Sequence, residues 1–130
     1  MLDPNARAAA VLDTATGDIA ARRFDIAETR LVRLLRTRPD YGEAWHKLGT
    51  LHYLMGRDAE CLADCHHSLE LEPRHFGALC TIGEIFFGSG EIDGARLAFH
   101  TARRLHPHHI AANARLVELS VRSYGEAPPA

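Results

Sequence analysis

Apolar residues recur at intervals of three and four along most of the chain, and short breaks with glycine or proline separate the runs. This spacing predicts amphipathic helices. The first predicted helix begins at Asp3-Pro4, where a capping carboxylate precedes a proline at the first helical position, and it extends to about Ala21. A second helix over about residues 24–37 ends before Pro39, because proline disfavours a helical conformation in the residue that precedes it.

The rest of the chain predicts two further helix pairs and one unpaired helix. The second pair turns at Gly56 and ends before Pro73, and the third turns at residues 88–90 and ends before Pro107. A last amphipathic helix extends from about residue 109 to 124, with an apolar stripe of Ala114, Leu116, Val117 and Val121. A stacked array must cover the face of its last unit, so a single helix with a polar outer side suits a cap.

Proline recurs at an interval of 34 residues, and the residues around it keep the same interval. The corresponding positions share large, small or apolar character: Trp45 and Leu79, Leu48 and Ile82, Gly49 and Gly83, Gly56 and Gly90, and Cys61 and Ala95. A repeat of this length in helical segments predicts stacked helix-turn-helix units. Such arrays offer an interaction surface more readily than a catalytic pocket.

These residues resemble the tetratricopeptide repeat, whose pattern is W-x2-L-G-x2-Y, then A-x3-F, then a small residue and proline. The second unit supplies Trp45, Leu48, Gly49, His52, Cys61, Cys65, Ser68 and Pro73. The third unit supplies Leu79, Ile82, Gly83, Phe86, Ala95, Phe99, Ala102 and Pro107. The first unit departs from the pattern in its first helix and returns to it in its second.

The resemblance implies an all-α fold, a right-handed α-solenoid of three helix-turn-helix repeats of about 34 residues with a C-terminal capping helix. Residues 1–124 are then expected to form one domain. Its parts are repeats at about 8–41, 42–75 and 76–109, a capping helix at 110–124 and a disordered tail at 125–130.

In this family the first helix of each pair lines the concave groove, so the resemblance implies which residues face a bound peptide. The predicted peptide-binding groove consists of Glu43, His46, Lys47, Thr50, Tyr53, Leu54, Thr81, Glu84, Phe87, Arg115, Glu118 and Arg122. Lys47 or an arginine is expected to pair with an acid of the ligand, and Tyr53 and Phe87 to supply apolar contacts. The alternative is a solvated face that has no ligand.

One ligand class of the family is disfavoured. Family members that grip the C-terminal carboxylate of chaperones place lysine, asparagine and arginine at set groove positions. The matching positions here are Leu12, Thr16, Lys47, Gly77 and Thr81. Only one charge remains among them, so we do not expect binding of chaperone tails.

Composition narrows the choice of partner. A chain of 130 residues with 46% hydrophobic and 25% charged content is typical of one soluble globular domain. A formal net charge of −2 gives no field that would attract nucleic acid or an anionic membrane. The N-terminus lacks a basic start followed by an apolar run. We therefore expect a cytoplasmic protein with a protein or peptide partner and with neither nucleic acid nor membrane.

Nine histidines and three cysteines raise the alternative of a metal-binding or thiol-dependent protein. The best candidate site joins His52 to Cys61 and Cys65, which are four residues apart on one helical face. The segment at residues 106–109 is a second candidate. Buried cysteines and a histidine in place of an aromatic residue are also what a packed core would contain. We favour packing and predict no metal and no cofactor.

Catalysis is not predicted, because no nucleophile motif and no phosphate-binding loop is present. Cys80 is the most plausible reactive thiol. The arginines on and around the second helix are expected to form a solvated convex face, with an acidic partner as the alternative: Arg22, Arg23, Arg30, Arg33, Arg36 and Arg38. A self-assembly module, and hence a homo-oligomer, is a third possible function beside the scaffold and the metal protein.

Overall fold

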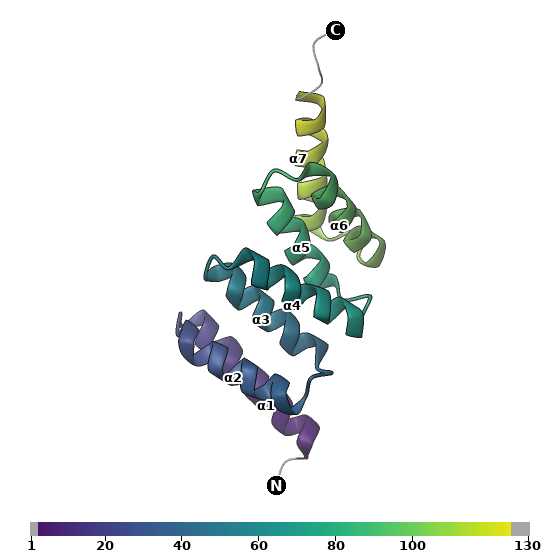
Figure 1. The fold of residues 1–130 in the computed structure, drawn as a ribbon. Helices are drawn as coiled ribbons and strands as arrows, with labels where there is room; N and C mark the ends of the chain where they lie inside the picture. The colour runs from purple at the N-terminus through teal and green to yellow at the C-terminus, as the bar shows by residue number, and fades with distance from the viewer. Residues whose placement is uncertain (1–2, 126–130) are drawn as a thin grey trace. The chain divides into compact units, whose positions relative to one another are not determined.

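The computed structural model describes residues 3–125, which form seven α-helices and no strand (Figure 1). The helices are α1 (Pro4–Ala20), α2 (Phe24–Thr37), α3 (Gly42–Leu54), α4 (Asp58–Leu71), α5 (Phe76–Gly88), α6 (Ile92–Leu105) and α7 (Ile110–Gly125). This confirms the all-α prediction and the order of helix pairs. Gly125 still belongs to α7, and the rest of the predicted tail lies outside the described residues.

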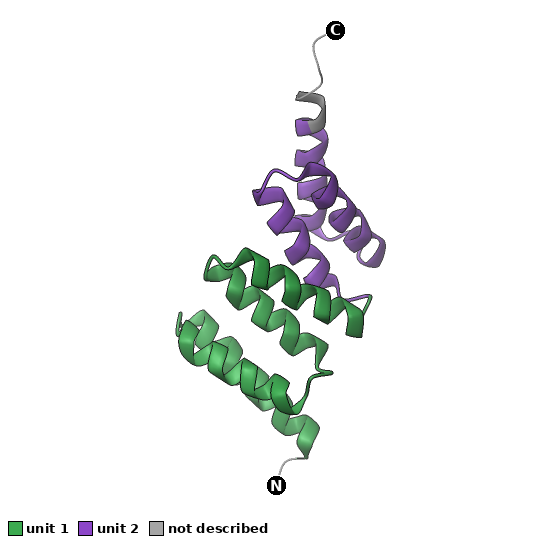
Figure 2. Ribbon diagram, in the orientation of Figure 1, with its two compact units in different colours: residues 1–73 green, residues 74–130 purple. Residues whose placement is uncertain are grey.

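The chain divides into two compact units, which Figure 2 distinguishes by colour. Unit 1 ends at Pro73 and contains α1 to α4, and unit 2 begins at Arg74 and contains α5 to α7. In unit 1, α1 packs on α2, α2 on α3 and α3 on α4. In unit 2, α5 packs on α6 and α6 on α7. The single domain over residues 1–124 stays a prediction.

Local sequence explains where the helices begin and turn. The Asp3 carboxylate accepts a hydrogen bond from the Ala6 amide at 2.8 Å, which caps α1 as the Asp3-Pro4 pair predicts. Gly56 and Gly90 have φ values of 77° and 80° in the turns of the second and third pairs. Arg22 holds the same place in the first pair with φ 61°, so a residue with a Cβ adopts the left-handed conformation there.

Small residues allow the helices of a pair to cross closely. A Cβ on Gly83 would lie 2.7 Å from the Phe99 ring, and a Cβ on Gly49 would lie 3.1 Å from the Cys65 sulfur. Phe99 and Cys65 are both fully buried, so neither crossing has room for a larger residue. The shared glycine of the repeat therefore marks a close helix crossing in both pairs.

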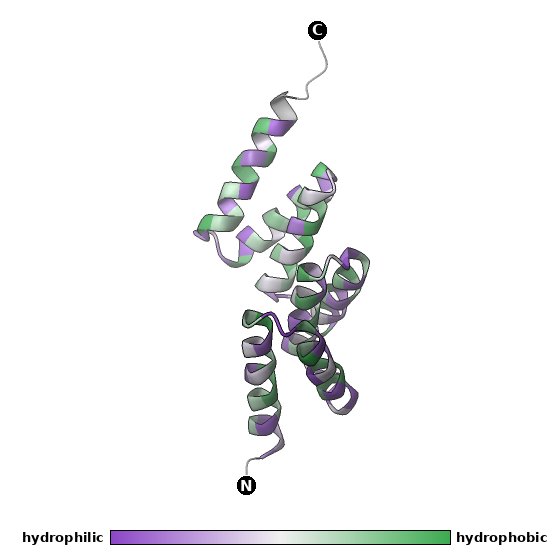
Figure 3. Cartoon of the chain, turned by 90° about the vertical axis from the view of Figure 1, so that its left-hand side faces the viewer, coloured by the Kyte–Doolittle hydropathy of each residue, from purple (hydrophilic) through white to green (hydrophobic). Residues whose placement is uncertain are grey.

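The apolar stripe predicted for α7 is wrong in part. The side that packs in unit 2 carries Ala112, Leu116 and Leu119, and only Leu116 belongs to the predicted stripe. Val117 and Val121 are 64% and 66% exposed. Residues at positions 112, 116 and 119 share one helical face, and the two valines lie on another. Polar and apolar residues therefore alternate along the exposed part of α7, the helix next to the C mark in Figure 3.

Within the described part of the chain, no helix combines the length and the apolar composition that crossing a membrane requires.

Candidate functional site

Five of the predicted groove residues come together on α5 and α7 of unit 2. We call them the Phe87 cluster: Glu84, Phe87, Arg115, Glu118 and Arg122. The guanidinium carbons of Arg115 and Arg122 lie 4.2 and 4.3 Å from the centre of the Phe87 ring. Both distances are within the range of a cation–π interaction. The helix pair α5–α6 and the added helix α7 thus bring together residues that are 38 positions apart in the sequence, from Glu84 to Arg122.

The two arginines of the cluster differ in their ionic partners. Arg115 donates from Nε to Glu84 Oε1 at 2.9 Å and from Nη1 to Glu118 Oε2 at 3.0 Å. Two carboxylates therefore fix its guanidinium over the ring. Among the described residues, no acidic side chain pairs with Arg122, which is exposed. The cluster offers an apolar ring with one cation that is held in place and a second that is available to an anion.

The predicted groove residues that belong to unit 1 lie on one side of α3. We call this side the α3 face: Glu43, His46, Lys47, Thr50, Tyr53 and Leu54. Tyr53 and Leu54 are 40% and 47% exposed, although both are large. The Thr50 hydroxyl donates to the His46 carbonyl at 3.1 Å, so its proton is used within the helix. The face therefore combines a lysine with two accessible apolar side chains, and the opposite side of α3 is buried.

Thr81 is the one predicted groove residue without a place in either group. It lies on α5, and its hydroxyl donates to the Gly77 carbonyl at 2.9 Å. The bond keeps the donor within the helix, so Thr81 offers a ligand little beyond its methyl group.

A buried polar network that the sequence did not predict links three helices of unit 1. His52 Nδ1 lies 2.6 Å from Asp64 Oδ2, and His52 Nε2 lies 2.8 Å from Glu28 Oε2. Arg57 Nη1 donates to the same Glu28 oxygen at 3.0 Å. Burial lowers the pKa of His52, but the hydrogen bonds to the two carboxylates outweigh it, so this pKa lies above its ordinary value. Burial also raises the pKa of Asp64, and the bond to His52 opposes that shift.

The candidate metal site of His52, Cys61 and Cys65 is therefore wrong. Carboxylates hold both ring nitrogens of His52. Cys61 and Cys65 are fully buried, and the hydrogen bond between the two thiols, together with burial, raises the pKa of Cys65. Among the described residues, no cysteine and none of the histidines at 106–109 belongs to a group of three converging ligand atoms. A signal for the network was present, because Asp64 shares the core face of α4 with the two cysteines.

Cys80 does not have the properties of a reactive thiol. Burial, with a smaller contribution from the charge of Glu84, raises the pKa of Cys80 to about 11. The thiol is therefore protonated at neutral pH, whereas the thiolate is the nucleophile.

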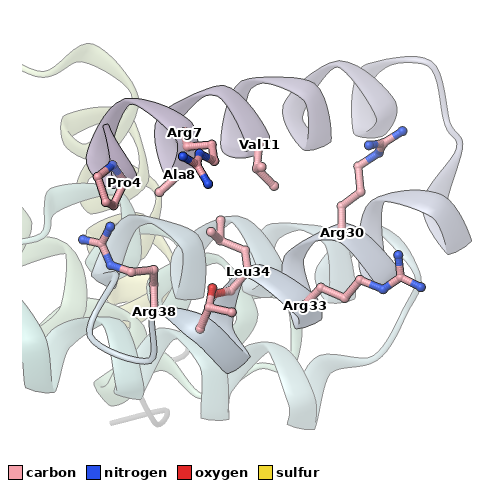
Figure 4. A pocket seen from close by; sticks show the side chains of 9 residues that line it. Pro4, Arg7, Ala8, Val11, Arg30, Arg33, Leu34 and Arg38 are labelled. Carbon is pink, nitrogen blue, oxygen red and sulfur yellow. The ribbon is translucent and has the colours of Figure 1, made fainter. Parts of the chain in front are cut away.

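Unit 1 also contains a cavity of about 610 Å³ between α1 and α2, which we call the α1–α2 groove (Figure 4). Its lining consists of Pro4, Arg7, Ala8, Val11, Arg30, Arg33, Leu34, Thr37 and Arg38. The sequence predicted a solvated arginine face here. Five of those six arginines are exposed, and Arg38 is half-exposed. The structure also groups three of them with Arg7, because residues on one side of α1 face residues on one side of α2.

Comparison with known proteins gives one curated relative. A TPR repeat-containing protein of Rhizobium etli is 38% identical over 72 residues, which are 55% of this chain and 35% of that protein. The chain thus matches about a third of the length of its relative. No family model matches the chain.

Solved structures give a likeness over most of the chain. The first TPR of Spaghetti (RPAP3), bound to an HSP90 peptide, has a TM-score of 0.84 at 14% identity and covers 90% of this chain and 93% of that one. PcrH in complex with the chaperone-binding region of PopD has a TM-score of 0.82 at 18% identity and covers 94% and 96%. At such identities the likeness concerns the fold. The repeat of 34 residues, the helix pairs and these similarities show that the chain has the tetratricopeptide-repeat (TPR) fold.

Proposed function

We propose that this chain is a non-catalytic scaffold that binds a protein or peptide segment through the Phe87 cluster and the α3 face. The observation that carries the proposal is the Phe87 ring with an arginine 4.2 Å and another 4.3 Å from its centre. Arginine and aromatic residues dominate the energetics of protein interfaces. A ligand that places an apolar side chain on the ring and an acidic group beside Arg122 would use both features of the cluster.

The cluster is organised before any ligand arrives. Glu84 and Glu118 hold Arg115 in position, and the residues lie on helices rather than on loops. Little side-chain order is then lost on binding, which favours affinity because ordering costs are a main penalty of association. Arg122 is free to form a bidentate pair with a carboxylate of the ligand.

The α3 face supplies a second contact region of similar character. Tyr53 and Leu54 expose more apolar surface than solubility requires, and Lys47 lies on the same side of the helix. We propose that Lys47 pairs with an acidic group of the ligand and that Tyr53 packs against an apolar one.

The TPR structures that resemble this chain support the proposal indirectly. One holds an HSP90 peptide and another the chaperone-binding region of PopD. The predicted groove positions hold only one of the charges expected for binding a chaperone tail, so we propose a different peptide sequence as the ligand.

The test is a selection from a displayed library of random peptides, followed by affinity measurements with the enriched peptides. We expect Phe87→Ala and Arg122→Gln each to weaken binding by about tenfold, the effect of losing one interface residue worth about 1.4 kcal/mol. Leu97→Ala is the matched control, because Leu97 is an exposed apolar residue on α6. Peptides that bind wild type and both cluster variants equally would show that the cluster is not the binding site.

Self-association is a separate proposal for the same chain. Val117 and Val121 leave apolar surface exposed on α7, which favours contact with another protein surface. Sedimentation over a range of concentrations checks it. A single monomeric species at all concentrations would exclude the homo-oligomer and leave the peptide-binding proposal unaffected.

A further inference from the structure

The α1–α2 groove is formed by one side of each of two helices. α1 contributes Pro4, Arg7, Ala8 and Val11. α2 contributes Arg30, Arg33, Leu34 and Thr37, and Arg38 directly follows its last residue. Both sets follow the spacing of three and four residues that marks a single helical face. The groove therefore extends along the two helices for about two turns, or roughly 10 Å at a rise of 1.5 Å per residue.

The charge of the groove has one sign. Four of its nine lining residues are arginines, and none is acidic. Arg30 is already bonded through Nε to the buried Asp18 carboxylate at 2.7 Å. Arg38 lies 3.8 Å from Asp40, which is a weaker pairing. Among the described residues, Arg33 has no acidic partner, and it is exposed. The positive charge of Arg33 is therefore available to an acidic ligand at the rim of the groove.

Figure 4 shows how the arginines are distributed. Arg7 and Arg38 lie at the end of the groove that is next to Pro4, and Arg30 and Arg33 lie at the other end. Ala8, Val11 and Leu34 lie between the two arginine pairs. The groove therefore has a cationic end, an apolar middle and a second cationic end.

We propose that the α1–α2 groove binds an acidic amphipathic helix of a partner protein. A third helix fits into the trough between two packed helices, because side-chain ridges on one helix occupy the grooves formed by others. The apolar side of the partner helix packs mainly on the half-buried Val11, with Ala8 and Leu34, which are buried in the core of unit 1, beneath it. Its carboxylates pair with the arginines at both ends, and arginine suits this role because its guanidinium binds carboxylates in a bidentate manner.

The groove also restricts the sequence of its partner. Arg38 caps the C-terminus of α2 eight residues after Arg30, which places the two about 12 Å apart along the helix axis. The partner helix therefore carries acidic residues separated by about two turns on one face, with apolar residues between them. α7 of a second copy does not meet this requirement, because it carries Arg115 and Arg122 against one acid, Glu118. The occupant that we propose is therefore a helix of a different protein rather than α7 of a second copy.

The experiment uses a synthetic helical peptide of about 15 residues, with two glutamates about seven positions apart and leucines on the same face between them. Its labelled form is titrated with the full chain, and fluorescence anisotropy measures the affinity. We expect Arg33→Glu to weaken binding by about tenfold or more, since it places like charges together. Arg36→Glu is the matched control, because it makes the same change of charge on the same helix at a residue outside the groove.

Four further results decide the proposal. A peptide with lysines in place of the glutamates should fail to bind, and so should a scrambled peptide of the same composition. Equal losses for Arg33→Glu and Arg36→Glu would show only a general electrostatic attraction and would overturn the proposal. The absence of binding by the acidic peptide at millimolar concentration would also overturn it. Circular dichroism confirms that both variants are folded, and neither variant changes the Phe87 cluster, so failure here leaves the proposed peptide-binding function untouched.

Discussion

The helix pairs α3–α4 and α5–α6 repeat with the same spacing but fill their interiors with different chemistry. Two buried polar residues of the first pair correspond to apolar residues of the second, His52 to Phe86 and Asp64 to Ala98. The exposed Glu60 beside His52 corresponds to Gly94. In the first pair, His52 is held between two carboxylates. In the second, a Cβ on Gly94 would lie 2.9 Å from the Phe86 ring, so the ring fills the space that a side chain would need.

What the two pairs share is the small residue at the helix crossing. Gly49 and Gly83 hold the same position, and the side chain opposite each is fully buried. Close approach of the two helices therefore defines the repeat unit. The rest of its interior accepts either a hydrogen-bonded polar network or apolar packing. A polar network is tolerated only because each buried group has a partner.

The largest expected difference between the pairs concerns the residues opposite those glycines. Phe99→Ala should lower the free energy of unfolding of unit 2 by about 3–5 kcal/mol, because it removes a fully buried ring. Cys65→Ala, the equivalent change in unit 1, should cost about 1 kcal/mol, because it removes about one methylene equivalent. Urea unfolding measures both. Equal losses would show that the two interiors do not differ in the way described.

The polar network gives the next largest effect. Asp64→Ala should cost about 1–3 kcal/mol, because it leaves a buried nitrogen of His52 without its partner. The combined change of His52→Phe, Asp64→Ala and Glu60→Gly introduces the chemistry of the other pair and should recover most of that loss. Chemical denaturation of both variants tests whether the two interiors are interchangeable. A combined variant less stable than Asp64→Ala alone would contradict the comparison.

The turns differ between the repeats as well. Arg22→Gly should raise the free energy of unfolding by about 0.5–1 kcal/mol, because glycine adopts φ 61° without the strain of a Cβ. Gly56→Ala, at the equivalent position with φ 77°, should lower it by about 1 kcal/mol. Thermal unfolding of the two variants provides the measurement. The same sign of change in both would show that the first turn is not equivalent to the second.

The smallest effect is the dependence on pH. Glu28, Glu60, Asp64 and Arg57 surround His52, and its pKa in the folded protein lies above the ordinary 6.5. A raised pKa stabilises the folded state fully below pH 6.5, and this contribution is lost as the pH rises through the folded value. The stability difference between wild type and His52→Gln should therefore shrink from pH 5.5 to pH 8. Because Phe86 replaces the histidine in unit 2, Phe86→Leu serves as the control and should show no such trend.

Much of the fold follows from local sequence. The proline interval and the turn glycines predict the helix pairs, and the small residues shared at Gly49 and Gly83 lie at the close crossings. Glu84 and Phe87 of the cluster were predictable from the resemblance, which implies the side of α5 that lines the groove. The contacts within the cluster were not, since they depend on how α7 packs.

The missed features all depend on pairing between distant positions. The bonds of His52 join residues 12 and 24 positions away, and no local pattern specifies such partners. The α1–α2 groove needs Arg7 to face residues of α2. On α7, apolar residues occupy more than one face, so the spacing alone did not select the face that is buried.

The most direct test of the peptide-binding account is site-specific photo-crosslinking with an enriched library peptide. Benzoylphenylalanine is placed at Tyr53 on α3 or at Leu97 on α6, which are both exposed. The account predicts a crosslink to the peptide from position 53 and none from position 97. A peptide that crosslinks from position 97 and not from position 53 would contradict it.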